Sequence, residues 1–200
     1  MGRARSARAS PARTKTRHAS RRLALPNNRA LRAVIVSDTH SNPHPDSLKY
    51  VAREQPDVIL HGGDIGDLAV LDRLAELAPL IAVRGNIDEH APHVPDSVDI
   101  AITEGDEVRL KILLTHIAVY GPKLRADAAR LAQAHGAQLV VCGHSHVPFI
   151  GRDRGLVLFN PGSIGPRRMH LPITFGVLEV SPTSASLRHM SCETGERWTP

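Results

Sequence analysis

The stretch VVCGHSHVP (residues 140–148) carries an apolar run directly into a glycine and two histidines one residue apart. Residues 139–141 are apolar and mostly β-branched, which predicts a short buried strand. Residues i and i+2 point to the same side of extended backbone but lie far apart around a helix, so His144 and His146 are expected to converge from an extended segment. The stretch therefore predicts a strand whose carboxyl end delivers two imidazoles, and open α/β sheets place their sites at such ends.

Further apolar runs along the chain resemble this strand and alternate with amphipathic stretches. RAVIV (32–36), DVILH (57–61) and LIAV (80–83) are predicted as buried strands. Amphipathic periodicity predicts helices over residues 46–54 and 67–77, between these strands. Strands that alternate with helices in this way are typical of parallel βαβ units, so we assign the chain to the α/β class.

The second half of the chain is mixed in character and richer in strands. SVDIAIT (97–103) and EVRLKILLTH (107–116) alternate polar and apolar residues around the turn-forming cluster at 104–106, which predicts an antiparallel hairpin. A helix is predicted over residues 123–134, and further strands over VLFN, TFGVLEV and SASLRHM.

Composition and charge narrow the class further. Only 3% of the residues are aromatic, so the core must rest on Val, Leu, Ile and Ala, which favours an α/β fold over a β-sandwich. Residues 1–32 hold ten of the 25 Lys and Arg residues and none of the 20 acidic residues; residues 33–200 therefore hold 15 basic and 20 acidic residues, a balance of −5. The positive net charge describes the amino-terminal segment, and the acidic remainder argues against a nucleic-acid partner.

The opening segment, residues 1–30, is rich in Arg, Ser and Ala and lacks the apolar periodicity that offsets the entropy of ordering. We predict a disordered basic tail over residues 1–30 and one folded domain over residues 31–200. Three interpretations of the tail stay open: an inert or wrongly extended start, an arm that binds nucleic acid or an acidic partner, and an organellar transit peptide.

The cellular setting follows from what the sequence lacks. No apolar run approaches the roughly eighteen residues of a membrane span, and the amino terminus has no hydrophobic stretch of a secretory signal. Cys142 and Cys192 belong to no CxxC motif or framework of paired spacings. We therefore predict a cytoplasmic protein with reduced thiols and no membrane span, with organellar import through the basic tail as the alternative.

Five of the predicted strands are each followed by side chains that can bind a metal. They are Asp38, His40, Asp64, Asn86, His116, His144 and His146. Glycines precede three of them and let the backbone approach a shared centre without a Cβ clash. Carboxylate, amide and imidazole ligands without thiolate suit Mn, Fe, Zn or Ni, and seven are too many for one tetrahedral ion. Two ions about 3.5–4 Å apart would use all seven, with Asp64 as the natural bridge.

Five short motifs, in this order, resemble those of the calcineurin-like metallophosphoesterases: DTH (38–40), GDIGD (63–67), GNID (85–88), LLTH (113–116) and GHSH (143–146). NPGS (160–163) followed by PRR is similar to the small one-domain bacterial and archaeal phosphodiesterases of that superfamily, which are related to a scaffold subunit of the retromer coat. The resemblance implies a four-layer αββα sandwich, in which two mixed β-sheets are flanked by helices.

The same resemblance implies a ligand arrangement and a reaction. Asp38, His40 and His146 would bind one divalent ion, Asn86, His116 and His144 would bind the other, and Asp64 would lie between them. Manganese is the favoured ion, with nickel, iron and zinc as alternatives. A hydroxide held by two cations can attack phosphorus in line while both ions neutralise the phosphoryl oxygens. We therefore expect a phosphodiesterase that acts on a small phosphate ester.

A non-catalytic or weakly catalytic scaffold on the same fold is the alternative. Ile87 stands where many members carry a histidine that protonates the leaving alkoxide, a general acid worth about 10²–10⁴ in rate. Ala118 likewise stands where relatives often carry another histidine. The small subfamily commonly lacks the histidine at the Ile87 position, and a pure scaffold has no chemical need for seven intact ligands, so the enzyme is favoured.

Further side chains are assigned from their place near the motifs. Asp67 and Asp88 are expected to orient metal ligands by hydrogen bonds, and Arg167 is expected to bind the substrate phosphate. Four other histidines are expected to be solvated or capping residues without a role: His61, His90, His93 and His170. No run of residues specifies a nucleoside, lipid or sugar pocket or an oligomeric state.

Overall fold

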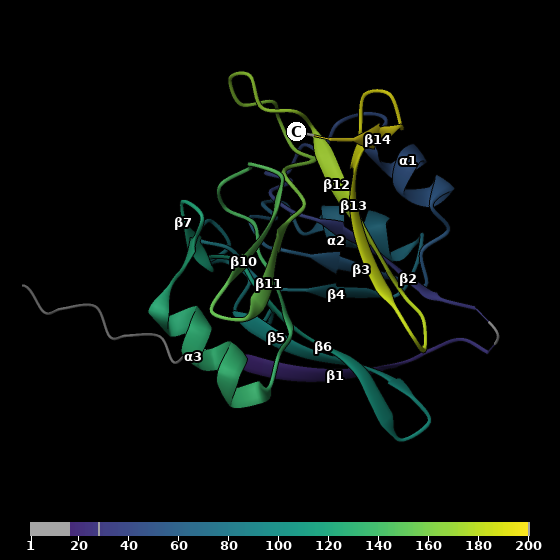
Figure 1. Ribbon diagram of the computed structural model, residues 1–200. Coiled ribbons are helices and arrows are strands. Elements are labelled where there is room, and N and C mark those ends of the chain that lie inside the picture. Colours follow the sequence, from purple (N-terminus) through teal and green to yellow (C-terminus); the bar gives the residue numbers. More distant parts are fainter. Residues whose placement is uncertain (1–16, 28, 200) are drawn as a thin grey trace, which may run out of the picture.

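Two six-stranded β-sheets lie face to face at the centre of the molecule (Figure 1). The computed structural model describes residues 17–27 and 29–199. In spatial order, the strands of sheet A are β1 (His18–Ala24), β5 (Ser97–Glu104), β6 (Glu107–Thr115), β9 (Leu139–Val141), β11 (Leu156–Asn160) and β10 (Phe149–Asp153). Those of sheet B are β14 (Arg197–Trp198), β13 (Ala185–Ser191), β12 (Thr174–Val180), β2 (Leu31–Val36), β3 (Val58–His61) and β4 (Leu80–Ala82).

Both sheets mix parallel and antiparallel pairs. In sheet B, β2, β3 and β4 are parallel, whereas β12 and β13 add antiparallel neighbours. In sheet A, β5 and β6 form the predicted antiparallel hairpin, and β9 lies parallel to β6 and to β11. A separate small hairpin pairs β7 (Val119–Tyr120) with β8 (Lys123–Leu124).

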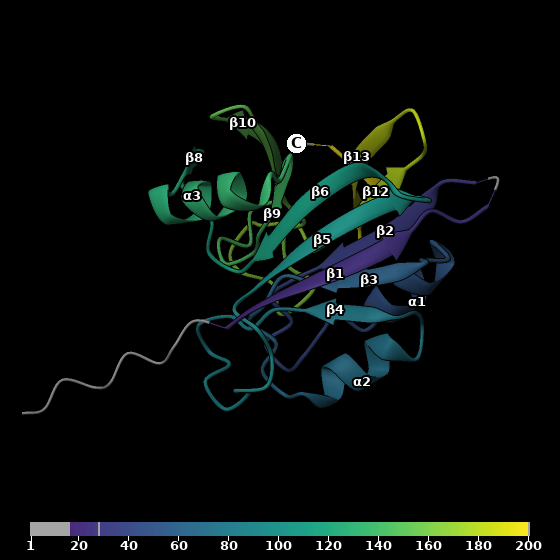
Figure 2. The same ribbon diagram turned by 90° about the horizontal axis from the view of Figure 1, so that it is seen from below.

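Helices cover the outer face of each sheet (Figure 2). α1 (Ser47–Arg53) and α2 (Ala69–Ala75) pack on sheet B through Val51, Val70 and Leu74. α3 (Ala126–His135) packs on sheet A through alanines and ends at Gly136, whose φ of 66° is the left-handed conformation of a helix cap. The molecule therefore has four layers, with the two sheets in the middle.

The buried side chains divide between these layers according to strand alternation. In β2, Ala33 and Ile35 belong to the core between the sheets, whereas Val34 and Val36 belong to the core beneath α1 and α2. Residues 33–36 are buried on both faces of the sheet, which is why they form a continuous apolar run in the sequence. The predicted α/β fold with two mixed sheets and flanking helices is confirmed.

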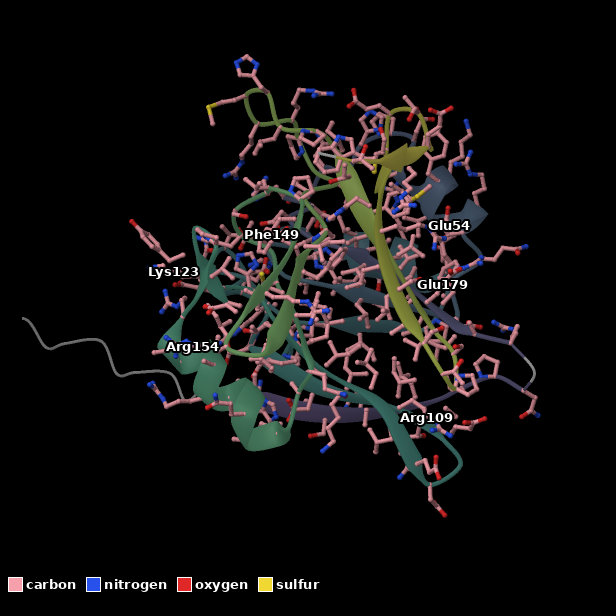
Figure 3. All side chains as sticks on the ribbon, viewed as in Figure 1. Glu54, Arg109, Lys123, Phe149, Arg154 and Glu179 are labelled. Atoms are coloured by element: carbon pink, nitrogen blue, oxygen red, sulfur yellow. The ribbon has the colours of Figure 1, made fainter. Side chains whose placement is uncertain are left out.

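A polar network joins the strands of sheet B on the side of α1. Arg32 lies 2.7 Å from Glu179, its register partner in β12, and Arg188 of β13 contacts both Glu179 (3.1 Å) and Glu54 (2.9 Å). Figure 3 shows Glu54 and Glu179 on this side of the molecule. Glu179 and Arg188 each pair with two partners, so the network aligns β2, β12 and β13 more firmly than separate surface pairs would.

The sequence patterns located most elements and missed the less apolar ones. The predicted helices are shorter in the structure, at Ser47–Arg53, Ala69–Ala75 and Ala126–His135. β10, β14 and the β7–β8 hairpin were not predicted, because they are short and only partly buried. Each of these segments depends on a neighbouring strand rather than on its own apolar pattern.

The prediction of a disordered tail over residues 1–30 is wrong for residues 18–24. These residues form β1, the edge strand of sheet A, which pairs in parallel with β5 over seven residues. Ala19 and Leu23 pack against the core between the sheets, while the residues between them are exposed. Pairing with β5 supplies the stabilisation that so polar a strand could not supply by itself. Residues 1–16 lie outside the described residues.

Two further expectations concern the thiols and the membrane. Cys142 and Cys192 are both free and buried, as predicted for reduced thiols. Among the described residues, no helix combines the length and the apolar character needed to cross a bilayer.

We predict that deletion of residues 1–24 destabilises the protein by about 2–4 kcal/mol, because it removes the partly buried Ala19 and Leu23 and exposes the core side of β5. Urea unfolding of the truncated and full-length chains measures this loss. Deletion of residues 1–16 leaves β1 intact and serves as the control, with a change below about 0.5 kcal/mol. Equal stability of all three chains would contradict the role of β1.

Candidate metal centre

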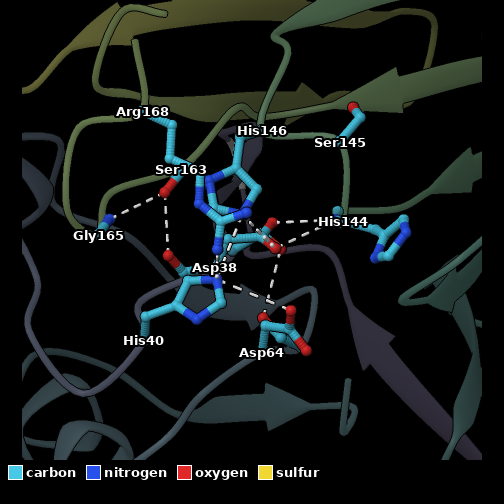
Figure 4. A network of polar contacts seen from close by, with 12 residues as sticks. Asp38, His40, Asp64, His144, Ser145, His146, Ser163, Gly165 and Arg168 are labelled. Carbon is cyan, nitrogen blue, oxygen red and sulfur yellow. Dashed lines mark hydrogen bonds and ion pairs between the residues drawn. The ribbon is translucent and has the colours of Figure 1, made fainter. Parts of the chain in front are cut away.

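Loops that follow five strands deliver the seven predicted ligands to one place. β2, β3 and β4 of sheet B are followed by Asp38, His40, Asp64 and Asn86, and β6 and β9 of sheet A by His116, His144 and His146. Figure 4 shows the side chains of Asp38, His40, Asp64 and His146 close together, with the backbone of His144 bonded to Asp38. The site therefore lies where the carboxyl ends of strands from both sheets meet.

The ligand loops adopt strained backbone rather than extended backbone. Five of the seven residues have positive φ: Asp38 (56°), His40 (45°), Asp64 (52°), His144 (70°) and His146 (59°). The expectation that His144 and His146 converge from extended backbone is therefore wrong, because sharp left-handed turns aim each side chain individually. Such conformations cost about 1–3 kcal/mol each and concentrate at functional sites.

Hydrogen bonds between the loops hold this strained backbone. The amide of Asp38 donates to the carbonyl of Gly63 (2.9 Å), and that of His40 donates to the carbonyl of Asp64 (3.0 Å). The amide of His144 donates to both oxygens of Asp38 (3.2 and 3.1 Å). These bonds cross between loops of different strands, so each loop fixes the conformation of the next.

Two glycines permit the close approach of the loops. A Cβ on Gly85 would lie 2.1 Å from Asp64 Oδ1 and 2.2 Å from its backbone nitrogen. A Cβ on Gly143 would lie 2.0 Å from Ser37 Oγ and 2.6 Å from Asp38 Oδ2. The predicted reason for glycines beside the ligands is confirmed, since side chains here would collide with the carboxylates.

The seven side chains form two groups that meet at Asp64. In the first group, His146 Nε2 lies 3.2 Å from Asp38 Oδ1 and 3.2 Å from His40 Nε2. In the second group, Asn86 Oδ1 lies 3.1 Å from His116 Nε2 and 2.9 Å from His144 Nδ1. Asp64 faces both groups, with one oxygen 3.2 Å from His116 Nε2 and the other 3.7 Å from His40 Nε2.

The charges at the site favour the binding of cations. Burial acts to raise the pKa of Asp64, but the hydrogen bond and charge of His116 and the amide of Ile87 outweigh it and lower the pKa to about 2. Burial is also the largest cause that lowers the pKa values of His40 and His144, which keeps both imidazoles neutral. An ionised carboxylate and neutral imidazoles are the forms that bind metals.

His116 is held in the orientation that a metal ligand needs. Its Nδ1–H donates to the carbonyl of Gly62 (2.8 Å), which turns Nε2 toward Asp64 and Asn86. Burial acts to lower the pKa of His116, but the hydrogen bond to Asp64 and the charge of Asp38 outweigh it and raise the pKa. A cation would therefore displace a proton from Nε2 when it binds.

The donor set fits two divalent cations. Two carboxylates, one amide and four imidazoles are mixed hard and borderline ligands, suited to Mn, Fe, Zn or Ni. Cys142 belongs to neither group of converging donors; its thiol is buried beneath α3, and burial raises its pKa to about 12.

Asp67 and Asp88, which were expected to orient metal ligands, have different environments in the structure. Asp88 is buried and accepts hydrogen bonds from the amides of Ile65, Gly66 and Gly85, so it fixes the Asp64 loop through backbone groups. Asp67 is exposed and accepts from the amide of Ala69, at the start of α2. Asp67 is therefore bonded to the start of α2, and its assignment as a residue that orients a ligand stays a prediction.

Arg167, which was expected to bind the substrate phosphate, makes its contacts elsewhere in the structure. The Arg167 guanidinium pairs with Glu193 and donates to the carbonyl of Leu171, so it is engaged away from the ligands. Its neighbour Arg168 lies against the site instead, 3.1 Å from His40 Nε2 (Figure 4). Two adjacent residues in a turn point in different directions, and the sequence contained no signal that distinguishes them.

Sequence reasoning also missed three residues that support the loops. His61 is completely buried between the ligand loops, where it bonds to Thr39 Oγ1 (3.1 Å) and accepts from the amide of Gly63 (3.1 Å). Burial lowers the pKa of His61 to about 4. Its position as the last residue of the apolar run DVILH was the available signal. Asn160 and Ser163, from the NPGS motif, bond to the carbonyls of Gly143 and Asp38.

The other histidines without an assigned role are exposed. His93 and His170 lie at the surface, and His90 lies 2.9 Å from the carbonyl of Gly66. Ala118 is buried beneath α3.

Comparison with known proteins identifies the family. The sequence model of the calcineurin-like phosphoesterase superfamily domain matches residues 31–183, and the chain belongs to this superfamily. A probable metallophosphoesterase of Methanocaldococcus jannaschii is 32% identical over 133 residues, which cover 64% of this chain and 66% of that protein. The phosphodiesterase YfcE of Escherichia coli is 32% identical over 116 residues, which cover 55% of this chain and 58% of that protein.

A solved structure supports the fold. Vps29 of Entamoeba histolytica, complexed with zinc, is 21% identical and superimposes with a TM-score of 0.67, covering 84% of this chain and 96% of that chain. The family and the two groups of converging side chains together indicate a binuclear centre for divalent metals in a phosphoesterase.

We predict that Gly85→Ala destabilises the protein by about 1–3 kcal/mol and lowers the amount of manganese bound, because the new Cβ displaces Asp64. Thermal unfolding and elemental analysis after dialysis measure the two effects. Gly151→Ala is the matched control, since its Cβ would meet Phe149 at an ordinary 3.6 Å. Unchanged metal content in Gly85→Ala would show that Asp64 tolerates displacement.

Proposed function

We propose that this protein is a phosphodiesterase that hydrolyses a small phosphate ester with two divalent cations. The observation that carries the proposal is the convergence of seven donor side chains, from both sheets, into two groups that share Asp64. Manganese is the favoured ion, and nickel, iron and zinc suit the same donors. The name of the Escherichia coli relative supports the diesterase over the monoesterase.

The residues divide between the two cations according to their contacts. Asp38, His40 and His146 would hold one cation, Asn86, His116 and His144 the other, and Asp64 would contact both. Bound there, the cations would activate water for attack on phosphorus and neutralise the phosphoryl oxygens. The protein itself keeps Asp64 ionised and orients His116 through the carbonyl of Gly62. Asp88 fixes the loops that carry Asp64 and Asn86 through their backbone amides.

Arg168 is proposed as the residue that binds the substrate phosphate, in place of Arg167. Its guanidinium donates to Nε2 of a neutral His40, the same lone pair that a cation would take. Binding of the cation would therefore release Arg168, which is exposed at the edge of the site and free to turn toward an anionic ester. A guanidinium suits this role because it can bind two phosphate oxygens at once.

The position of Ile87 supports a preference for esters with good leaving groups. Its amide donates to Asp64 Oδ1 (3.2 Å), while its side chain is 40% exposed beside the ligands. An isoleucine cannot donate a proton to a leaving alkoxide. Esters whose leaving group has a low pKa do not need this proton and should react faster.

We predict that the full-length protein hydrolyses bis(p-nitrophenyl) phosphate with added manganese and that EDTA stops the reaction. Asp64→Asn and His146→Ala should each lower the rate at least about 100-fold, since both remove proposed ligands. Release of p-nitrophenol measures the rate, and circular dichroism verifies the fold. His93→Gln, at an exposed histidine, serves as the control and should retain full activity. Undiminished turnover in both ligand variants would refute the proposal.

We predict that Ile87→His raises the hydrolysis rate of alkyl phosphate esters at least about tenfold, because the imidazole can protonate the alkoxide. The rate on p-nitrophenyl esters should change less than about twofold, since nitrophenolate leaves without a proton. Release of the alcohol from the alkyl esters and of p-nitrophenol from the nitrophenyl esters gives the comparison. Ile87→Gln, polar but unable to act as an acid, should leave both rates near those of the parent. An equal gain in Gln and His variants would rule out proton donation.

A further inference from the structure

A second cluster of metal-binding side chains lies on the outer face of sheet A. It consists of His18 from β1, Asp99 from β5 and His135, the last residue of α3. Val98 and Ile100 face the core between the sheets, so strand alternation turns Asp99 to the opposite face, toward α3. Figure 1 shows the start of β1 beside the end of α3. None of the seven side chains of the central site takes part.

The three side chains already converge on one carboxylate oxygen. His18 Nε2 lies 2.7 Å from Asp99 Oδ2, and His135 Nδ1 contacts the same oxygen. The two imidazole rings lie 4.6 Å apart, and the three donor atoms all lie within 4.8 Å of one another. In a tetrahedral zinc site with bonds of about 2.0–2.1 Å, ligand atoms are separated by about 3.3 Å. Small side-chain rotations would therefore bring all three atoms into coordination.

Two details favour a cation over a simple hydrogen-bonded array. The other carboxylate oxygen, Asp99 Oδ1, is buried and has no hydrogen-bond partner among residues 17–27 and 29–199. A buried acceptor without a partner is costly, and a cation placed between the ligands can engage it. In addition, His18 Nδ1 lies 2.9 Å from Ser97 Oγ, a contact that fixes the ring and leaves Nε2 as the metal-facing atom.

The cluster has a route of access from solvent. Asp99 and His135 line a cavity of about 210 Å³, together with Ser20, Arg21 and Lys111. His18 and His135 are themselves partly exposed. Three protein ligands and one position open to water match the coordination of zinc by two histidines and a carboxylate.

We propose that His18, Asp99 and His135 form a separate site for one zinc-class divalent cation, with water as the fourth ligand. The ligands come from the edge strand β1, its partner β5 and the end of α3, so the cation joins the end of α3 to the paired strands β1 and β5. Binding to the folded form alone stabilises that form in proportion to the metal concentration. The site therefore adds a metal-dependent contribution to the attachment of β1, beside its pairing with β5.

Zinc stoichiometry tests the proposal. The parent is the full-length, tag-free chain with Asp64→Asn and His146→Ala, which weaken the central site; it is dialysed against zinc chloride and analysed for bound metal. Adding His18→Gln or His135→Gln should lower the bound zinc by one ion per chain, whereas adding His93→Gln should not. Equal zinc in the parent and both cluster variants would overturn the proposal and leave the cluster as a hydrogen-bonded array.

Hydrogen exchange provides a measurement that does not depend on counting ions. Zinc should slow amide exchange in β1 at least about tenfold in the parent and should have no such effect in the parent with His135→Gln. Because His135 lies outside β1, the difference between the two proteins must pass through the shared cation. Exchange in β1 that responds equally to zinc in both proteins, or in neither, would refute the site even if a variant changes overall stability.

Discussion

The contact between Asp64 and His116 joins the two sheets at the site, and the rest of the arrangement depends on it. Asp64 follows β3 of sheet B, and His116 follows β6 of sheet A, with 3.2 Å between their side-chain atoms. Sheet B supplies four of the seven donors, and sheet A supplies three. A binuclear site can form only if the packed core between the sheets sets their loops at this separation. The geometry of the metal site therefore depends on the packing of the apolar core.

The same hydrogen bonds compensate for the backbone strain in the ligand loops and for the burial of their carboxylates. Left-handed backbone at Asp38, Asp64 and His144 is unfavourable by itself, and so is a carboxylate with little access to water. Amides of neighbouring loops donate to these carboxylates and carbonyls and thereby fix the backbone that strain would otherwise release. Protein groups alone thus hold the loops together through hydrogen bonds, without a contribution from a cation.

The sequence predicted the strands that have regular apolar periodicity and the donors that lie in motifs. It did not predict features that depend on the conformation of a single turn. Strands such as 32–36 are apolar on both faces and are visible as runs, and the seven donors follow such strands. The direction of Arg168 rather than Arg167 depends on one turn after Gly165, and no pattern encodes it. β1 was missed because only Ala19 and Leu23 of its seven residues contact the core, and its stability comes from a strand about 80 residues distant.

The structure gives a physical reason for the contrast between the basic amino-terminal segment and the acidic remainder of the chain. Basic groups between residues 17 and 32 face acidic side chains of the folded domain: Arg29 lies 2.5 Å from Asp57, and Arg32 lies 2.7 Å from Glu179. The excess of acid in residues 33–200 is therefore partly the counterpart of the basic segment itself, and the folded domain, rather than an external acidic partner, is the surface that this part of the segment binds.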